Sequence, residues 1–405
     1  MNNIIKFSEI VAAKQRLKSV TKITDLMTSK SFSQMANANV FLKLENLQST
    51  GSFKVRGAYN KLASLTDEEK QKGVVAASAG NHAQGVAFSA TRLGVKSTIF
   101  MPIFTPPLKV LATRGYGANV ILTGETFDDA YEASQKYCKE HNATYIHPFD
   151  DKMIIAGQGT IGIEIYDQLP EVDIVLVPIG GGGLISGVAL AMKELNPNIK
   201  IIGVEAEGAA SMYASRKSKE IVNLPKISTI ADGIAVKKPG KLTYSIIEDL
   251  VDDLVVVNDT EIAHAAYLLL QRAKLLAEPS GVAPMAAVLF KKCDFVNKNV
   301  VTIISGGNIN MQILEQIIEK GMYEEGLKTC IQLIIPDQPG ELKKILSVLD
   351  SLKANIADIE HDRSNADVTV GNTMLTIKLH LQSQEQLKVI INQFKELGLK
   401  CKVIN

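Results

Sequence analysis

The amino-acid sequence predicts an α/β protein of two lobes followed by a smaller α+β domain, and two patterns support this prediction. Through residue 320, short strands alternate with helical segments, and each strand is apolar at consecutive positions. Strands of that kind are typical of parallel sheets that helices cover on both faces. Beyond residue 320 the strands instead alternate apolar and polar residues, which is typical of an antiparallel sheet with one buried face.

Two series of strands and helices lie within residues 1–320, and they predict two lobes with a cleft between them. The first series follows a strand at 40–44, and its own strands are expected at 74–77, 97–101, 119–122 and 144–147. Its helices are expected at 56–65, 81–93, from Pro107 onward, and 126–140. We expect the smaller lobe to lie within residues 50–148.

The second series begins with an expected helix at 153–169. Its strands are expected at 173–178, 200–204, 254–257 and 300–305, and its further helices at 184–195, 259–276, 281–291 and 309–320. Residues 211–241 show no regular pattern, so this stretch is expected to be irregular.

Residues 321–328 are expected to form a linker, and residues 329–405 a domain of their own. Strands are expected at 329–335, 356–361, 373–381 and 400–404, with helices at 341–352 and 384–397. That order is βαββαβ in about 80 residues, which predicts a ferredoxin-like domain.

The composition narrows the class of protein. The 405 residues are 46% hydrophobic and carry a net charge of +1, so no electrostatic preference for nucleic acid or membranes is expected. No apolar run approaches the length of about 18 residues that a membrane span needs, and residues 1–18 predict a short amphipathic helix. Four widely spaced cysteines and six dispersed histidines favour a cytoplasmic protein without disulfides or a transition-metal site.

Lys54 is the first candidate for chemistry. It follows Thr50-Gly-Ser-Phe53 and opens an apolar helical segment, whereas a lysine normally lies on a solvated surface. Two other stretches, 78–82 and 180–183, have the character of sites for a phosphorylated ring. An amine beside such a site is what a cofactor attached to lysine through its aldehyde requires.

The segment Gly180-Gly-Gly-Gly183 is the candidate phosphate site. It lies between an apolar strand and a helix, where backbone N–H groups and the positive end of the helix favour an anion. A flexible turn is the alternative, although four glycines cost considerable conformational entropy. Residues 157–162 also match GxGxxG, but no strand precedes them and no acidic residue follows at the required distance, so we reject dinucleotide binding.

The stretches Ser78-Ala-Gly-Asn-His82 and Ser305-Gly-Gly-Asn308 each follow a predicted strand. Ser78 and the N–H groups at the start of the next helix are suited to a substrate carboxylate. Taken alone, the first stretch is an ordinary helix cap and the second an ordinary turn.

Together these segments resemble the fold type II pyridoxal-phosphate enzymes (tryptophan synthase β-like), and most closely the threonine ammonia-lyases. The likeness spans nearly the whole chain. It rests on residues 44–54, 77–85, 180–184, 229–233, 277–281 and 305–308. The C-terminal domain resembles an ACT domain, of which the turn at 336–342 is typical.

The resemblance implies a role for each motif. Lys54 would hold pyridoxal 5'-phosphate as a Schiff base and then act as the base at the substrate Cα. The other cofactor-binding residues would be Phe53 and Gly233 on the ring faces, Asn81 at the ring hydroxyl, Gly180, Gly181, Gly182, Gly183 and Leu184 at the phosphate, and Ser305 at the pyridine nitrogen. The substrate would contact Ser78, Ala79, Gly80, Asn81 and His82.

The activity implied is conversion of L-threonine to 2-oxobutanoate and ammonia, the first step toward isoleucine, with L-serine giving pyruvate as a secondary reaction. Related serine racemases have a second serine at the position of Ala79, so its absence favours the lyase. The alternatives are a catabolic serine/threonine dehydratase, a β-replacement enzyme such as cysteine synthase, and a non-catalytic amino-acid sensor.

Two further sites follow from the resemblance. Relatives bind a cation where this chain has Glu205, Ala209 and Ser211, and Ser211 in place of an acidic residue favours a monovalent ion or none. An effector, either isoleucine, valine or AMP, would bind near Asp337, Gly340, Glu341 and Leu342.

The protein is expected to be a homo-oligomer, either a dimer or a tetramer. Thr24-Asp25-Leu26, where relatives have Thr-Pro-Leu, is expected to alter only a local turn.

Overall fold

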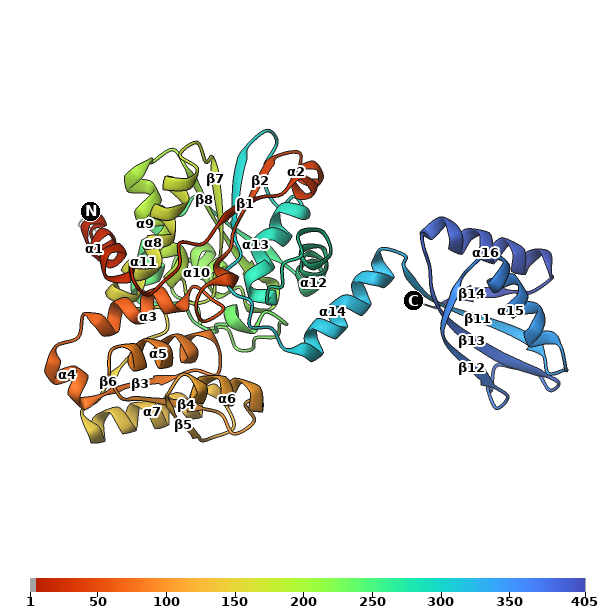
Figure 1. The fold of residues 1–405 in the computed structure, drawn as a ribbon, viewed down its shortest axis with the longest axis horizontal. Coiled ribbons are helices and arrows are strands. Elements are labelled where there is room, and N and C mark those ends of the chain that lie inside the picture. The colour runs from red at the N-terminus through yellow and green to blue at the C-terminus, as the bar shows by residue number, and fades with distance from the viewer. Residues whose placement is uncertain (1–4, 405) are drawn as a thin grey trace. The chain divides into compact units, whose positions relative to one another are not determined.

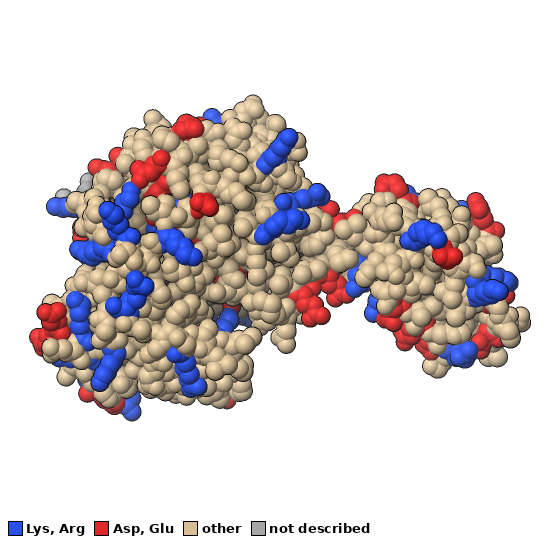
Figure 2. Space-filling model, in the orientation of Figure 1, with Lys and Arg blue, Asp and Glu red and all other residues tan. Residues whose placement is uncertain are grey.

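The computed structural model describes residues 5–404, and the chain divides into two compact units, residues 1–310 and 311–405 (Figure 1). Both units carry positive and negative side chains scattered over the face shown in Figure 2. Among the described residues, no helix is long and apolar enough to cross a membrane.

The first unit contains two sheets, as the two series of strands predict. The larger sheet has the order β1-β2-β10-β7-β8-β9, and the smaller one has the order β5-β4-β3-β6. Every neighbouring pair is parallel except β1 and β2. The strands of the larger sheet are β1 (Leu26–Thr28), β2 (Asn39–Lys43), β7 (Ile174–Pro178), β8 (Lys200–Ala206), β9 (Asp253–Val257) and β10 (Asn299–Ile303). Those of the smaller sheet are β3 (Val74–Ala77), β4 (Ser97–Met101), β5 (Asn119–Leu122) and β6 (Thr144–Tyr145).

Helices cover both faces of the smaller sheet, as Figure 1 shows for α5 (Asn81–Arg92) and α7 (Phe127–His141). Val74 and Ala76 of β3 belong to one buried apolar cluster, which includes residues of α5. Val75 and Ala77 belong to a second cluster, which includes Ala130 of α7. Because successive side chains of a strand point to opposite faces, both faces need apolar residues. This explains why the strand is apolar at consecutive positions.

The remaining helices of the first unit surround the two sheets. They are α1 (Phe7–Leu17), α2 (Lys30–Ala36), α3 (Lys54–Ala63), α4 (Asp67–Lys72), α6 (Pro107–Gly115), α8 (Lys152–Gln168), α9 (Gly183–Leu195), α10 (Ser211–Ser218), α11 (Lys241–Leu250), α12 (Asp259–Leu268) and α13 (Pro279–Leu289). The helix predicted over residues 1–18 corresponds to α1, and residues 1–4 lie outside the described part of the chain.

Several elements differ from the sequence-based expectation. Helix α4 was not predicted, because it has no buried residue and therefore no apolar period in its sequence. The Thr66–Glu69 capping box and the acidic first turn stabilise it instead. The stretch 211–241, expected to be irregular, begins with α10. The single helix expected over 259–276 is α-helical only to Leu268 and continues as a π-helical turn, Leu269–Ala273. The stretch Thr24-Asp25-Leu26, where a difference from relatives was expected to alter only a local turn, leads into β1, which begins at Leu26.

After an initial helix, α14, the second unit has the βαββαβ order predicted from its alternating strands. Its elements are α14 (Met311–Glu324), β11 (Lys328–Pro336), α15 (Glu341–Ser351), β12 (Asn355–Asp362), β13 (Asn372–His380), α16 (Gln384–Glu396) and β14 (Cys401–Val403). The strands form an antiparallel sheet of order β12-β13-β11-β14. Alternate residues of β11 and β13, such as Ile331 and Ile377, are buried with residues of α15 and α16.

The boundary between the two units lies between Asn310 and Met311, whereas the sequence places the end of the first domain at residue 320. Helix α14 begins the second unit and continues through residues 321–324, which were expected to be linker. Ile317 and Gly321 are its buried residues. The helical period therefore continues across Gly321, which ends no helix here.

Helices α8 and α9 pack backbone against backbone at Gly159 and Gly187. A Cβ added to Gly187 would lie 2.4 Å from the Ile155 carbonyl oxygen and 2.5 Å from the Gly159 nitrogen. We therefore expect Gly187→Ala to lower the free energy of unfolding of the first unit by about 1–3 kcal/mol, despite the better helix propensity of alanine. Urea unfolding measures this change.

The matched control is Gly115→Ala at the end of α6, where an added Cβ would meet no atom within 4 Å. This variant should be neutral or stabilised by up to about 1 kcal/mol. Equal stability of the two variants would show that the α8–α9 contact is not tight.

Candidate active site

A cavity of about 780 Å³ opens in the first unit at the carboxyl ends of strands from both sheets. The segments after β3, β7 and β10 line it, together with Phe53 and Lys54 at the start of α3. Ligands of open α/β sheets bind at this edge because the loops and helix N-termini converge there. All the residues predicted to bind cofactor or substrate lie in the lining of this cavity.

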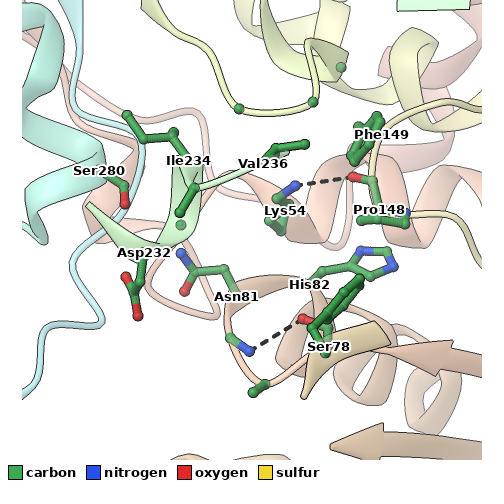
Figure 3. A pocket seen from close by; sticks show the side chains of 18 of the residues that line it. Lys54, Ser78, Asn81, His82, Pro148, Phe149, Asp232, Ile234, Val236 and Ser280 are labelled. Atoms are coloured by element: carbon green, nitrogen blue, oxygen red, sulfur yellow. Dashed lines mark hydrogen bonds between the residues drawn. The ribbon is translucent and has the colours of Figure 1, made fainter. Parts of the chain in front are cut away.

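Lys54 is the first residue of α3, and its side chain points into the cavity (Figure 3). Its Nζ donates a hydrogen bond to the carbonyl oxygen of Pro148 at 3.1 Å and lies 5.1 Å from the centroid of the Phe53 ring. Burial lowers the pKa of the Lys54 amine to about 8, although the negative charge of Glu278 opposes this shift. A larger fraction of the amine is thus neutral near pH 7, which makes it a better nucleophile and base.

The four glycines lie between β7 and α9, where no side chain fits. A Cβ on Gly181 would lie 2.2 Å from the ring of Phe149, and one on Gly180 would lie 2.9 Å from Cα of Ile234. Gly182 precedes α9 with a φ of 91°, in the left-handed region that glycine tolerates. The first N–H groups of α9 have no partner within the helix, so this edge of the cavity suits an anion.

We expect Gly181→Ala to weaken the binding of pyridoxal phosphate by about tenfold or more. The new methyl group would displace either Phe149 or the glycine backbone, and loss of one hydrogen bond to a charged phosphate costs on the order of that factor. Titration of the full chain with pyridoxal phosphate, followed by absorbance, measures the dissociation constant. Gly115→Ala lies outside the cavity and should leave this constant unchanged. A wild-type constant in Gly181→Ala would contradict phosphate binding at this segment.

The loop after β3 forms the opposite wall. The Gly80 N–H donates to Ser78 Oγ at 3.3 Å (Figure 3). A Cβ on Gly80 would meet no atom within 4 Å, so this residue faces open space. His82 is buried and forms a 2.8 Å hydrogen bond with the carbonyl oxygen of Ile146. Burial and the nearby Lys54 charge lower the pKa of His82 to about 3, so its imidazole is neutral at physiological pH.

A hydrogen-bonded chain of side chains joins Asn81 to two other segments. Asn81 Nδ2 donates to Glu278 Oε1 at 2.6 Å, and Asn81 Oδ1 accepts from Asn308 Nδ2 at 2.7 Å. Asn308 Nδ2 also donates to the Thr50 carbonyl oxygen at 2.9 Å. The segment that contains Ser305 is further tied to the start of α3, because the Phe53 N–H donates to the Ser305 carbonyl oxygen at 3.1 Å.

Gly233 and Ser280 also line the cavity. A Cβ on Gly233 would lie 2.8 Å from Ser280 Oγ, so only glycine leaves room there. Ser280 Oγ is buried without a hydrogen-bond partner. An amine, a helix N-terminus lined by glycine, and an unpartnered hydroxyl therefore surround one space. These groups fit a ligand with an aldehyde, a phosphate and a polar ring, which is what pyridoxal phosphate presents.

Several cavity residues were not predicted from the sequence. Glu278 and Ser280 lie within the stretch 277–281 and line the cavity. An acidic residue before a proline is also an ordinary start for a helix, here α13, so the sequence alone does not indicate this position of Glu278. Lys109 and Asp232 form an ion pair of 2.7 Å at the cavity wall. Residues 223–227 and 234–238 contribute further lining residues, and outside the stretch 229–233 the irregular sequence of this segment gives no signal of that position.

The candidate cation residues lie outside the lining of this cavity. Glu205 is buried and accepts from the N–H groups of Met212 and Tyr213 at 2.9 and 2.6 Å. Burial raises the pKa of the Glu205 carboxyl to about 8. Ser211 Oγ is buried without a partner, and Ala209 is buried nearby in sequence. Within residues 5–404, no group of three or more His, Cys, Asp or Glu side chains is arranged to hold a metal ion.

The four predicted effector residues lie between β11 and the first turn of α15 in the second unit. Asp337 forms a 2.8 Å ion pair with Arg363, and Glu341 forms one of 2.6 Å with Lys344. Gly340 precedes α15 with a φ of 96°. Leu342 packs against the apolar core of this unit.

Comparison with known proteins gives the family. The model of the family described as pyridoxal-phosphate dependent enzyme matches residues 18–306. The L-threonine ammonia-lyase of Thermotoga maritima is 44% identical over 401 residues, which are 99% of this chain and 100% of the relative. The L-threonine dehydratase catabolic TdcB of Staphylococcus aureus is 47% identical over 324 residues, 79% of this chain and 94% of the relative.

A solved structure agrees with these matches. The processed form of threonine deaminase isoform 2 from Solanum lycopersicum superposes with a TM-score of 0.74 and 40% identity, covering 77% of this chain and 92% of that one. The family match covers the cavity residues from Phe53 to Ser305, including Lys54 and the four glycines. This chain therefore belongs to the family of pyridoxal-phosphate-dependent enzymes.

Proposed function

We infer that the chain is a lyase that uses pyridoxal phosphate to convert L-threonine to 2-oxobutanoate and ammonia. The observation that carries this function is the Lys54 amine, placed at the start of α3 in a cavity with a glycine-lined helix N-terminus. The identity of 44% to an L-threonine ammonia-lyase along its whole length supports the choice of substrate. When bound, the cofactor supplies an aldehyde that condenses with the substrate amine and a ring that withdraws electrons from Cα.

Lys54 moves the proton in this reaction. With a pKa of about 8, its amine accepts a proton from the substrate Cα and can return one during the same turnover. The Pro148 carbonyl oxygen, 3.1 Å from Nζ, holds the amine at the cavity wall. The β-hydroxyl leaves as water, hydrolysis then consumes one water, and the net products are 2-oxobutanoate and ammonium.

The remaining residues bind and orient. Gly180 to Gly183 would take the phosphate of the cofactor, with Leu184 following in α9. Phe53 and Gly233 would contact the two faces of its ring, Asn81 would bind its hydroxyl and Ser305 its nitrogen. Ser78 and Gly80, at the start of α5, receive the substrate carboxylate.

The loop 78–82 favours elimination over racemisation. Racemisation needs a proton donor on the face opposite Lys54, and Ala79 offers none. His82 is also excluded as an acid there, since its pKa of about 3 leaves it neutral and its Nε2 is hydrogen-bonded to Ile146. We expect L-threonine to give keto acid without measurable D-allothreonine, the product of inversion at Cα alone.

Trapping the cofactor tests the role of Lys54 directly. Reduction of the loaded enzyme with borohydride should fix the cofactor to one peptide, the one that contains Lys54, as peptide mass spectrometry can show. Attachment at another lysine would overturn the proposed site.

L-serine lacks only the methyl group of L-threonine, so slower formation of pyruvate from L-serine is expected when turnover of the two substrates is compared.

We also propose that the second unit is an ACT domain that regulates the enzyme. Its βαββαβ order supports this, and the Thermotoga maritima relative matches along its full length. The effector would be isoleucine or valine, as in feedback control of the first step toward isoleucine, or AMP in a catabolic enzyme. It would bind near Asp337, Gly340, Glu341 and Leu342.

Calorimetric titration of the full chain with each compound tests this regulation. Heat for isoleucine or valine, lost in Gly340→Val, would support an amino-acid effector. Heat for AMP alone would indicate the catabolic type, and no heat for any of them would leave the unit an oligomerisation domain.

We further propose a homo-oligomer, either dimer or tetramer, in the cytoplasm; sedimentation of the full chain distinguishes the two assemblies. The four described cysteines, which form no disulfide, are consistent with that location.

A further inference from the structure

Glu278 is a buried carboxylate that the proposed mechanism does not use. It precedes α13, and only 5% of its surface is exposed. Its backbone is fixed, since its N–H donates to the Gly306 carbonyl oxygen at 3.0 Å and its own carbonyl accepts from Gly281. Among residues 5–404 no cation lies within ion-pair distance of its carboxylate. A buried acid without an ion pair is costly, so its retention calls for a functional explanation.

The carboxylate occupies the wall of the cavity beside the residues predicted to contact the cofactor. A Cβ on Gly306 would lie 2.4 Å from Glu278 Oε1, and one on Gly233 would lie 3.4 Å from it. The same oxygen accepts the 2.6 Å hydrogen bond from Asn81 Nδ2. The glycines at 233 and 306 therefore leave the space in which this carboxylate reaches Asn81.

The Asn81 carboxamide is held at both ends. While ionised, the Glu278 carboxylate accepts hydrogen bonds and cannot donate one, so the Nδ2 group of Asn81 must face it. Asn308 donates to Asn81 Oδ1 from the other side. One N–H of Asn81 remains for a ligand in the cavity, and its direction is set by these two partners.

Four charged or titratable groups act on each other at this wall. Burial and the charge of Asp232 raise the pKa of Glu278 to about 7. The hydrogen bond from Asn81 and the positive charges of Lys109 and Lys54 oppose this rise. In return, the Glu278 charge raises the pKa of Lys54 against the effect of burial. Glu278 thus influences both the ligand contact of Asn81 and the protonation of Lys54.

We propose that Glu278 is a positioning residue of the active site, which holds the Asn81 carboxamide in one orientation and supplies a negative charge that acts on the Lys54 amine. The proposal rests on the proposed function, because Asn81 and Lys54 matter only if they meet the cofactor. Glu278 itself need not touch the reacting atoms.

Two variants separate the two effects. Glu278→Gln keeps an oxygen that can accept from Asn81 but removes the charge. Glu278→Asp keeps the charge but withdraws the carboxylate by one methylene group, so that it no longer reaches Asn81. Glu205→Gln is the matched control, since Glu205 is also a buried glutamate with a raised pKa but does not line this cavity.

The first readout is the protonation of Lys54 in the full chain after removal of the cofactor. Acetic anhydride labels only neutral amines, and peptide mass spectrometry across pH gives the midpoint for Lys54. In Glu278→Gln this midpoint should fall by about one pH unit, as expected for loss of a nearby opposite charge. It should stay near the wild-type value in Glu278→Asp and in Glu205→Gln. An unchanged midpoint in Glu278→Gln would overturn the electrostatic part of the proposal.

The second readout is the dissociation constant of pyridoxal phosphate, measured by absorbance titration. Glu278→Asp should weaken binding by about tenfold, the order of one lost charge-assisted hydrogen bond. Added to Asn81→Ala, it should weaken binding no further, because both changes remove the same contact. Full additivity of the two changes, or wild-type affinity in Glu278→Asp, would overturn the positioning part.

Each variant is first compared with the wild type by thermal unfolding. Glu278→Met, which fills a similar volume without charge, replaces Glu278→Gln if that variant does not fold. Neither readout needs turnover. A failure of threonine deamination would therefore contradict the proposed function without deciding the role of Glu278, and the two failures are distinguishable.

Discussion

Replacing Lys54 by alanine is expected to lower kcat for L-threonine by about 10⁴-fold, because the variant loses the group that moves the Cα proton. Burial brings the pKa of this amine to about 8. Two other lysines of the cavity lining form ion pairs: Lys109 with Asp232 at 2.7 Å and Lys237 with Asp128 at 3.4 Å. The measurement is the rate of ammonium release at saturating cofactor, with cofactor occupancy determined on the same sample.

Lys61→Ala is the control for this prediction. Lys61 lies in the same helix α3, and its partly exposed side chain forms an ion pair with Asp151 at 2.7 Å. Loss of such a pair costs the fold about 1 kcal/mol or less. Lys61 does not line the cavity, so kcat should change by no more than about twofold. If Lys54→Ala kept a tenth of the wild-type rate with the cofactor bound, Lys54 would not be the catalytic base.

The second large effect is expected at Arg56, two residues after Lys54. Arg56 is fully buried and donates to Glu45 at 2.7 Å and to Glu164 at 2.6 Å. Lys43, also buried, pairs with Glu164 at 2.8 Å. The network joins β2, the turn before α3, α3 itself and α8, and the two acids raise the pKa of Arg56 against the effect of burial. It therefore fixes the helix that carries Lys54.

We expect Arg56→Leu to lower the free energy of unfolding of the first unit by about 3–5 kcal/mol, because removing one partner leaves buried charges without compensation. Urea unfolding followed by loss of cofactor absorbance reports on this unit alone. The exposed pair of Lys72 with Glu68 provides the control, and Lys72→Ala should cost at most about 0.5 kcal/mol. A similar change in both variants would mean that the network contributes little.

Much of the fold could be predicted because the signals are local. Residues 74–77 and 174–177 are apolar at consecutive positions, which the two covered faces of a parallel strand require, and the alternation at 373–381 reflects the single buried face of β13. The glycines at 180–183 were likewise noticeable because four in a row between an apolar strand and a helix are a local signal, and they line the cavity.

The rest depends on contacts between distant segments. The interaction of Glu278 with Asn81 spans 197 positions of sequence, and nothing near residue 278 indicates its partner. Ser280 is one of several serines that begin helices, and only the cavity shows that its hydroxyl lacks a partner. The end of the first unit was misplaced for a related reason: the apolar period of α14 continues past Gly321, and its sequence does not tell which unit it packs with.

The most direct test is the simultaneous measurement of 2-oxobutanoate and ammonium formed from L-threonine by the full chain loaded with pyridoxal phosphate. We expect both products to appear in equal amounts, at rates of at least about 1 per second, which is ordinary for enzymes. With Lys54→Ala both rates should fall by about 10⁴-fold. Absence of both products from the wild-type protein with its cofactor bound, for L-threonine and L-serine alike, would contradict the assignment of this site as a threonine lyase.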